Sequence, residues 1–238
     1  MKLLCLGHAG GSGSRLSRAL ARKLGRVGVV ALDLPGRGRR WREPTHARWP
    51  GLRRDLLEQA RQHLDGEPYA VLGHSLGALL AYELAIALDA AGTVRRPEIV
   101  VAAARHPPHA PPAGPPLADL DDEQLLGVIG QLGGLPERAG GTLLRQQFLP
   151  ALRADLALAA SYRAPSGRHP LSVPLAVLIG RSDPLTTEPV AAGWREYTRS
   201  TFTLRPMDGG HFFLTDDPGA TAAVLGELLT VAITERDR

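Results

Sequence analysis

The feature that most restricts the fold of this 238-residue chain is a strand that runs directly into a helix. Residues 68–75, "PYAVLGHS", form a mostly apolar run of strand length, and residues 76–92, "LGALLAYELAIALDAAG", follow with no linker. The second segment is rich in Ala and Leu, which favour a helix, and it ends at a glycine. Apolar elements of this kind are buried, as in a parallel sheet covered by helices. The junction therefore predicts an α/β fold.

Strand-like and helical patterns alternate along the rest of the chain. This alternation favours a mostly parallel central sheet with helices on both faces, within one domain over residues 1–238. A hydrophobic content of 44% is enough for a single sizeable core. Further strands are expected at residues 2–7, 27–36, 98–105, 174–184 and 201–211, and further helices at 14–24, 49–64 and 218–234.

The stretch from about residue 107 to residue 168 breaks this alternation. It opens within the proline-rich "HPPHAPPAGPP", residues 106–116, which is too rigid for a helix or for the interior of a sheet. Helical patterns follow at 121–132 and 141–162. A long insertion at one point of an α/β domain is typical of a lid over a binding site. We therefore expect a lid insertion over approximately residues 107–168.

Composition narrows the class of protein. The net charge of +4 comes almost entirely from arginine, because Lys2 and Lys23 are the only lysines. No nucleic-acid motif accompanies the arginines, so nucleic acid is not expected as a partner. No stretch matches a membrane span or a signal peptide, and we expect a cytoplasmic protein, by default a monomer, with no membrane partner. The single cysteine, Cys5, lies in an apolar run and is expected in the core.

The segment "CLGHAGGSGSRL", residues 5–16, is a glycine-rich turn between the first strand and the first helix. Such a turn binds the pyrophosphate of a dinucleotide or supplies a backbone N–H group to an oxyanion hole. Its glycine spacing, with Asp33 at the end of the next strand, resembles the cofactor turn of short-chain dehydrogenases. Those enzymes need a lysine four residues after a tyrosine, and no lysine follows Lys23. The dinucleotide interpretation is therefore rejected, as is a P-loop, which ends in Lys-Ser or Lys-Thr.

The pentapeptide Gly73-His74-Ser75-Leu76-Gly77 matches the pattern G-x-S-x-G at the strand-to-helix junction. A serine on so sharp a turn is strained and presents its Oγ above the sheet, and the flanking glycines leave room for neighbouring backbone. The N–H group of Leu76, at the positive end of the helix, can face a developing oxyanion. We therefore predict that Ser75 is a nucleophile; the alternative is that it only caps the helix.

A serine nucleophile needs a base to take its proton. In the α/β-hydrolase arrangement the acid and then the histidine follow the serine along the chain. The predicted base is His211, because "MDGGHFFL" follows the last expected strand and its glycines let the loop cross the top of the sheet. The other histidines after Ser75 are interpreted as exposed loop residues: His106, His109 and His169.

The base in turn needs an orienting acid. The predicted acid is Asp183, which follows the strand at 174–184 and can meet a histidine on the next loop. The alternative is Asp208, which is expected only to shape the turn before the histidine. The second oxyanion donor is predicted to be the N–H of Ala9 in the glycine-rich loop. This mechanism requires no metal and no cofactor.

Several motifs together resemble the type II thioesterases of polyketide and nonribosomal peptide assembly lines. They are "CLGHAGGSGS", "LDLPGRGRR", "LGHSLGALLAYELA", "FLPALRADLALAASYR", "PLAVLIGRSDP" and "MDGGHFFL", in this order from about residue 3 to residue 230. The resemblance implies a free-standing α/β hydrolase that cleaves acyl thioesters from the phosphopantetheine arm of acyl or peptidyl carrier proteins. It also implies a triad and two oxyanion amides: Ser75, Asp183 and His211, with Ala9 and Leu76.

Two other classes of function stay open at this stage. One is a different serine hydrolase on the same triad, such as an esterase, an acyltransferase or a cyclase. The other is a non-catalytic protein that binds carriers. A group of arginines could face an acidic carrier protein, although a solvated surface explains them as well. These are Arg37, Arg39, Arg40, Arg42, Arg48, Arg53 and Arg54.

Overall fold

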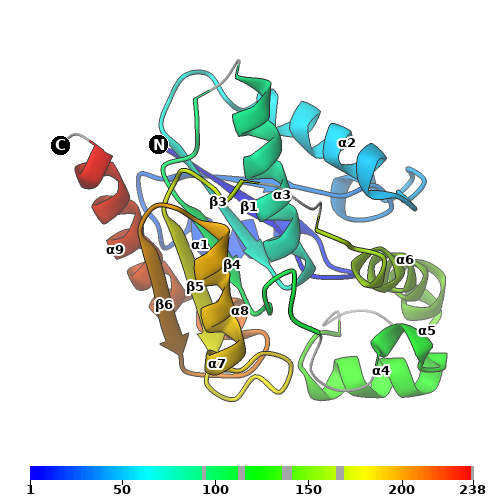
Figure 1. Ribbon diagram of the computed structural model, residues 1–238. Helices are drawn as coiled ribbons and strands as arrows, with labels where there is room; N and C mark the ends of the chain where they lie inside the picture. Colours follow the sequence, from blue (N-terminus) through cyan, green and yellow to red (C-terminus); the bar gives the residue numbers. More distant parts are fainter. Residues whose placement is uncertain (93–94, 112–115, 136–140, 165–168, 237–238) are drawn as a thin grey trace.

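The computed structural model describes residues 1–92, 95–111, 116–135, 141–164 and 169–236. Its centre is a parallel sheet with the strand order β2-β1-β3-β4-β5-β6 (Figure 1). All five neighbouring pairs are parallel. The strands are β1 (Lys2–Leu6), β2 (Gly28–Leu32), β3 (Tyr69–His74), β4 (Val100–Ala103), β5 (Leu175–Gly180) and β6 (Phe202–Met207). Each lies within a predicted strand, so the predicted α/β class is confirmed.

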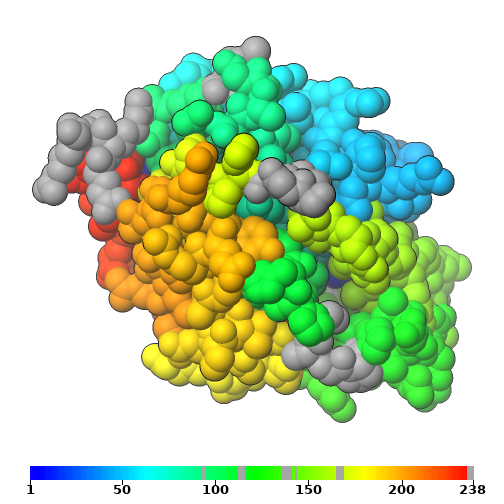
Figure 2. Space-filling view, in the orientation of Figure 1, coloured from blue at the N-terminus to red at the C-terminus, as the bar shows by residue number. Residues whose placement is uncertain are grey.

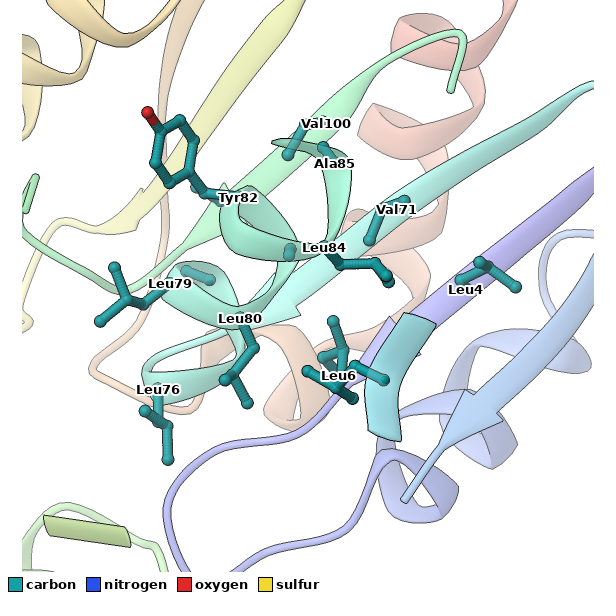
Figure 3. Close-up of a cluster of buried hydrophobic side chains, with 14 of the residues drawn as sticks. Leu4, Leu6, Val71, Leu76, Leu79, Leu80, Tyr82, Leu84, Ala85 and Val100 are labelled. Atoms are coloured by element: carbon teal, nitrogen blue, oxygen red, sulfur yellow. The ribbon is translucent and has the colours of Figure 1, made fainter. Parts of the chain in front are cut away.

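Helices cover both faces of the sheet. On one face lie α2 (Trp49–Arg61) and α3 (Leu76–Ala91), and on the other lie α1 (Gly13–Ala21) and α9 (Pro218–Arg236). Alternating side chains of each strand reach opposite faces: Leu4 and Leu6 of β1 pack toward α3, whereas Leu3 and Cys5 pack toward α1. Figure 3 shows the leucines of α3 beside those of β1. Cys5 is fully buried, as predicted, and burial raises the pKa of its thiol.

The insertion between β4 and β5 forms a separate group of helices beside the sheet, green to yellow-green in Figure 1. It contains α4 (Asp122–Gln131), α5 (Gly141–Leu143), a π-helical stretch (Leu144–Phe148) and α6 (Leu149–Ala160). The helical run is continuous over residues 141–160, as expected for 141–162, and the π-helical stretch changes its hydrogen-bond pattern locally just before α6. Part of the predicted lid, residues 112–115, 136–140 and 165–168, lies outside the described residues.

A small apolar cluster holds α4 against α6. It consists of Leu125, Ile129, Phe148, Leu149 and Leu152, all buried. The remaining short elements are 3-10 turns at Gly38–Arg40, Leu117–Asp119 and Ala192–Tyr197, and helices α7 (Glu188–Ala191) and α8 (Phe213–Asp216). Within the described residues, no helix combines the length and the apolar character needed to cross a membrane.

Candidate active site

Ser75 is the single residue between β3 and α3, and its backbone is strained. Its dihedral angles are φ 56° and ψ −115°, a conformation that non-glycine residues seldom adopt. The turn is tight: a Cβ at Gly73 would lie 1.9 Å from the carbonyl oxygen of Gly77, and one at Gly77 would lie 2.4 Å from that of Leu6. Both glycines of the pattern are therefore required by close backbone approach. The Ser75 side chain makes no capping hydrogen bond to α3, so helix capping does not explain it.

Asp183 and His211 come together at the carboxyl ends of β5 and β6. Asp183 Oδ2 lies 2.8 Å from His211 Nδ1, and both residues are buried, each 5% exposed. The other carboxylate oxygen accepts the backbone N–H of Leu185 at 2.9 Å. Because a carboxylate can only accept, Nδ1 of the imidazole carries the proton and Nε2 of the neutral ring carries a lone pair. The alternative acid, Asp208, is fully exposed and forms an ion pair with Arg181 instead.

A cavity of about 740 Å³ brings the predicted site residues together. Its lining includes Ala9, Ser75, Leu76 and His211, the residues predicted as oxyanion donors, nucleophile and base. Most of the rest is apolar and comes from the insertion and from α3. Figure 2 shows the surface hollowed between the green segment that follows β4 and the yellow-green α6. The geometry therefore places a strained serine and a buried Asp–His pair beside one largely apolar space.

Two histidines that were interpreted as exposed loop residues line this cavity. His106 is buried, 7% exposed, so the prediction is wrong for that residue. His109 is exposed and stacks on Tyr197, with ring centroids 5.7 Å apart. A hydrogen bond of 2.8 Å from Trp194 Nε1 to the carbonyl of Arg105 joins the segment after β4 to the 3-10 turn Ala192–Tyr197. The only sequence signal that could have placed His106 at the cavity was its position after the carboxyl end of a strand. His169 is exposed, as predicted.

His74, the second residue of the pentapeptide, holds the backbone of His211. Its Nε2 lies 2.7 Å from the carbonyl oxygen of His211, so Nε2–H donates and the tautomer is fixed. The ring packs against His8, His211 and Phe212, with centroids 5.2–5.5 Å apart. Burial lowers the pKa of His74 well below its usual value, and it lowers that of His8 to about 4. Both imidazoles are therefore neutral at pH 7.

Substituting His74→Phe should destabilise the protein and slow turnover, because the buried carbonyl of His211 then loses its donor although an aromatic ring still fills the position. An unsatisfied buried carbonyl costs about 1–3 kcal/mol of the free energy of unfolding. Urea unfolding of both proteins checks this, with exposed His169→Phe as the control. An unchanged midpoint for His74→Phe would show that the hydrogen bond contributes no stability.

Stability should depend on pH through the buried histidines. Burial, and then the charge of Arg105, lowers the pKa of His106 to about 4, below the usual 6.5. Between these two pH values the unfolded chain binds more protons, so the free energy of unfolding decreases as pH falls, by up to about 1.4 kcal/mol per pH unit for this group. Urea unfolding from pH 7 to 4.5 should give a shallower slope for His106→Gln than for the wild type. Equal slopes would contradict the shift.

Asp33, which fitted a ribose-binding acid, has a structural role. It is buried and accepts hydrogen bonds from Ser14 Oγ at 2.7 Å, Ser14 N at 3.2 Å and Arg39 N at 3.1 Å. Its carboxylate therefore satisfies one free N–H group and a hydroxyl at the start of α1, where a negative charge is favourable. The rejection of a dinucleotide site is consistent with this arrangement.

The arginine group does not form one surface. Arg37 is buried, 6% exposed, and pairs with Asp155, so for this residue both the docking and the solvated-surface interpretation are wrong. Arg40 is held by Glu43 and Asp55 at 2.5–2.6 Å, which raises its pKa. Arg39, by contrast, is 73% exposed. The described residues contain no group of three or more His, Cys, Asp or Glu side chains that could bind a metal ion.

The parallel sheet and the serine turn at its carboxyl edge define an α/β hydrolase. The family described as "Thioesterase domain" matches residues 1–229, and the chain belongs to this thioesterase family. It is similar to a "Probable cadicidin biosynthesis thioesterase" of Streptomyces griseus, 36% identical over 233 residues, which are 96% of this chain and 62% of that protein. The chain thus spans less than two thirds of the length of this relative.

Solved structures show the same relationship. The RedJ thioesterase from the prodiginine pathway of Streptomyces coelicolor is 34% identical, with a TM-score of 0.85 over 95% of this chain and 89% of that one. YbtT, a type II thioesterase from the yersiniabactin NRPS/PKS pathway, is 26% identical, with a TM-score of 0.84 over 97% and 93%. The resemblance to type II thioesterases is confirmed.

Proposed function

We propose that this protein hydrolyses acyl groups from the phosphopantetheine thiol of acyl or peptidyl carrier proteins, in editing or release during polyketide or nonribosomal peptide biosynthesis. The observation that carries the proposal is the buried hydrogen bond between His211 and Asp183, near a serine in a strained strand-to-helix turn. The family and the pathways named for RedJ and YbtT support the substrate class.

In the proposed mechanism, Nε2 of His211 takes the proton of Ser75 as Oγ attacks the thioester carbonyl. The backbone N–H groups of Ala9 and Leu76 stabilise the tetrahedral oxyanion, and Asp183 stabilises the imidazolium that forms. The phosphopantetheine thiolate leaves with the proton from His211. The imidazole then activates water, which hydrolyses the acyl-serine and frees the acid. Each step uses groups of this chain, and neither a metal nor a cofactor enters.

The cavity suits an acyl chain. Its apolar lining comes largely from α3 and the insertion: Leu79, Leu117, Leu156 and Ala159. We propose that the insertion, approximately residues 107–168, is a lid within a single domain over residues 1–238, and that it bounds the acyl pocket. We further propose that the protein is a cytoplasmic monomer that works without a membrane or nucleic acid, and that exposed arginines such as Arg39 and Arg42 face an acidic carrier.

A matched pair of substrates tests this proposal against an esterase. Acyl-pantetheine and the isosteric oxoester present the same acyl chain to the same cavity, and kcat/KM should favour the thioester. Faster oxoester turnover would favour an esterase.

A variant of one exposed arginine tests docking of the carrier. Arg39→Glu should raise KM for carrier-bound substrate and leave KM for acyl-pantetheine unaffected, because a small thioester makes no carrier contact. Equal effects of Arg39→Glu on both thioesters would exclude docking at this residue.

A further inference from the structure

A buried ion pair between Arg37 and Asp155 lies outside the proposed triad. Arg37 belongs to the "LPGR" segment after β2, and Asp155 belongs to "LRAD" in α6. Their side chains are 6% and 3% exposed, and Arg37 Nη1 donates to Asp155 Oδ2. Nη2 donates to the carbonyl of Pro35 at 3.1 Å. Because desolvation offsets most of the attraction in such a pair, stability alone gives little reason for charge at this position.

The same carboxylate oxygen holds the glycine-rich loop. Gly10 N–H donates to Asp155 Oδ2 at 2.7 Å. The carbonyl of Ala9, in the same peptide group, lies 3.0 Å from His8 Nδ1. A carbonyl only accepts, so this nitrogen of His8 is the donor. Both polar groups of the peptide that follows Ala9 are therefore fixed, and the N–H proposed as an oxyanion donor is on the adjoining peptide.

The backbone of this loop is tightly turned against α6. Gly11 N–H donates to the carbonyl of His8 at 3.0 Å and closes a four-residue turn. Gly10, at its third position, has φ +71°, as a type II turn requires. A Cβ at Gly10 would lie 2.9 Å from the Phe148 ring and 3.1 Å from Leu152 Cβ, so α6 contacts the turn directly. One side of the insertion thus supplies both the apolar contact and the charged acceptor.

We propose that Asp155, held in place by Arg37, is a positioning residue. It fixes the glycine-rich loop through Gly10 and so directs the Ala9 N–H toward the acyl oxygen. The inference rests on the proposed function of Ser75 and Ala9. It also means that the oxyanion hole is complete only when α6 packs against the loop, because the hydrogen bond joins the two segments.

Two variants and one control test this role. Asp155→Asn keeps one acceptor oxygen but loses the charge. The double variant Arg37→Met/Asp155→Leu removes the acceptor without leaving an unpaired buried charge, and such replacements are generally tolerated by the fold. The control is Asp122→Asn. Asp122 belongs to α4 and forms an ion pair of 2.7 Å with Arg153, which lies in α6 like Asp155, and the substitution breaks this pair.

The readouts separate positioning from folding. They are kcat and KM for acyl-pantetheine, and the second-order rate and final stoichiometry of Ser75 labelling by an alkyl fluorophosphonate, whose P=O oxygen occupies an oxyanion hole. We expect kcat and the labelling rate of the double variant to fall together by about 10- to 100-fold, as for a misplaced catalytic group. KM and the final stoichiometry should change little. Asp155→Asn should show a smaller loss, and Asp122→Asn should match the wild type.

Wild-type rates in the double variant would overturn the inference. So would a loss that appears only as fewer labelled molecules, since that result describes unfolded protein and not a displaced loop. A wild type that is labelled rapidly but hydrolyses no thioester would contradict the proposed function instead. In that case the labelling rates of the variants would still decide the role of Asp155, because the fluorophosphonate needs no thioester.

Discussion

Replacing Ser75 with alanine is expected to abolish hydrolysis, with kcat lowered by about 10⁴- to 10⁶-fold. Only the side-chain hydroxyl group is removed. Without it, His211 has no serine proton to accept and no acyl-enzyme forms. The fold should be kept, because alanine and serine meet the same steric cost at φ 56°. Carrier-bound acyl groups should still bind.

Single-turnover hydrolysis of an acyl-pantetheine measures this loss. Circular dichroism and the urea midpoint show whether the variant is folded, and fluorophosphonate should label the wild type alone. Turnover by a folded Ser75→Ala protein within about tenfold of the wild type would exclude the acyl-enzyme mechanism, since an oxyanion hole alone gives far less acceleration.

Substituting Asp183→Asn should lower kcat by about 10⁴-fold while leaving the shape of the site intact. In the wild type, the carboxylate of Asp183 accepts a hydrogen bond from His211 Nδ1 at 2.8 Å. An amide nitrogen turned toward the ring would donate instead, which places the proton on Nε2 and leaves the imidazole unable to take the serine proton. The measurement is kcat against pH for the variant and the wild type.

The matched control for this variant is Asp208→Asn. Asp208 is close to His211 in sequence, but its exposed side chain pairs with Arg181. Its loss should change kcat by less than about twofold, because surface ion pairs contribute little. If the two variants lost similar activity, the acid assigned here would be wrong, and the alternative considered from the sequence would have to be reopened.

The sequence was sufficient to predict the main parts of the fold. Strand and helix patterns depend on neighbouring residues, and the junction at Ser75 is local, so the strands and the serine turn were predictable. Asp183 and His211 could be paired because both follow strands, and the carboxyl ends of parallel strands share one edge of the sheet. Their hydrogen bond follows from that topology together with the order serine, acid, histidine.

Contacts between distant segments could not be predicted in this way. Arg37 and Asp155 are 118 positions apart, and nothing local distinguishes this arginine from its exposed neighbours. The arginine-rich composition favoured a surface interpretation, and packing of α6 against the glycine-rich loop overrode it. His106 is a similar case: it lines the cavity next to Arg105, whose carbonyl accepts a hydrogen bond from Trp194, 89 positions away.

Intact-protein mass spectrometry can show whether this chain cleaves acyl thioesters from carrier proteins through Ser75, as proposed. Purified enzyme would be incubated with a panel of acyl-phosphopantetheine carrier proteins, with Ser75→Ala as the control. We predict that free acid and the carrier with its thiol restored appear with the wild type alone, at rates that reveal the acyl preference. If every acyl group stays on its carrier while simple esters are cleaved, the proposed substrate class is contradicted.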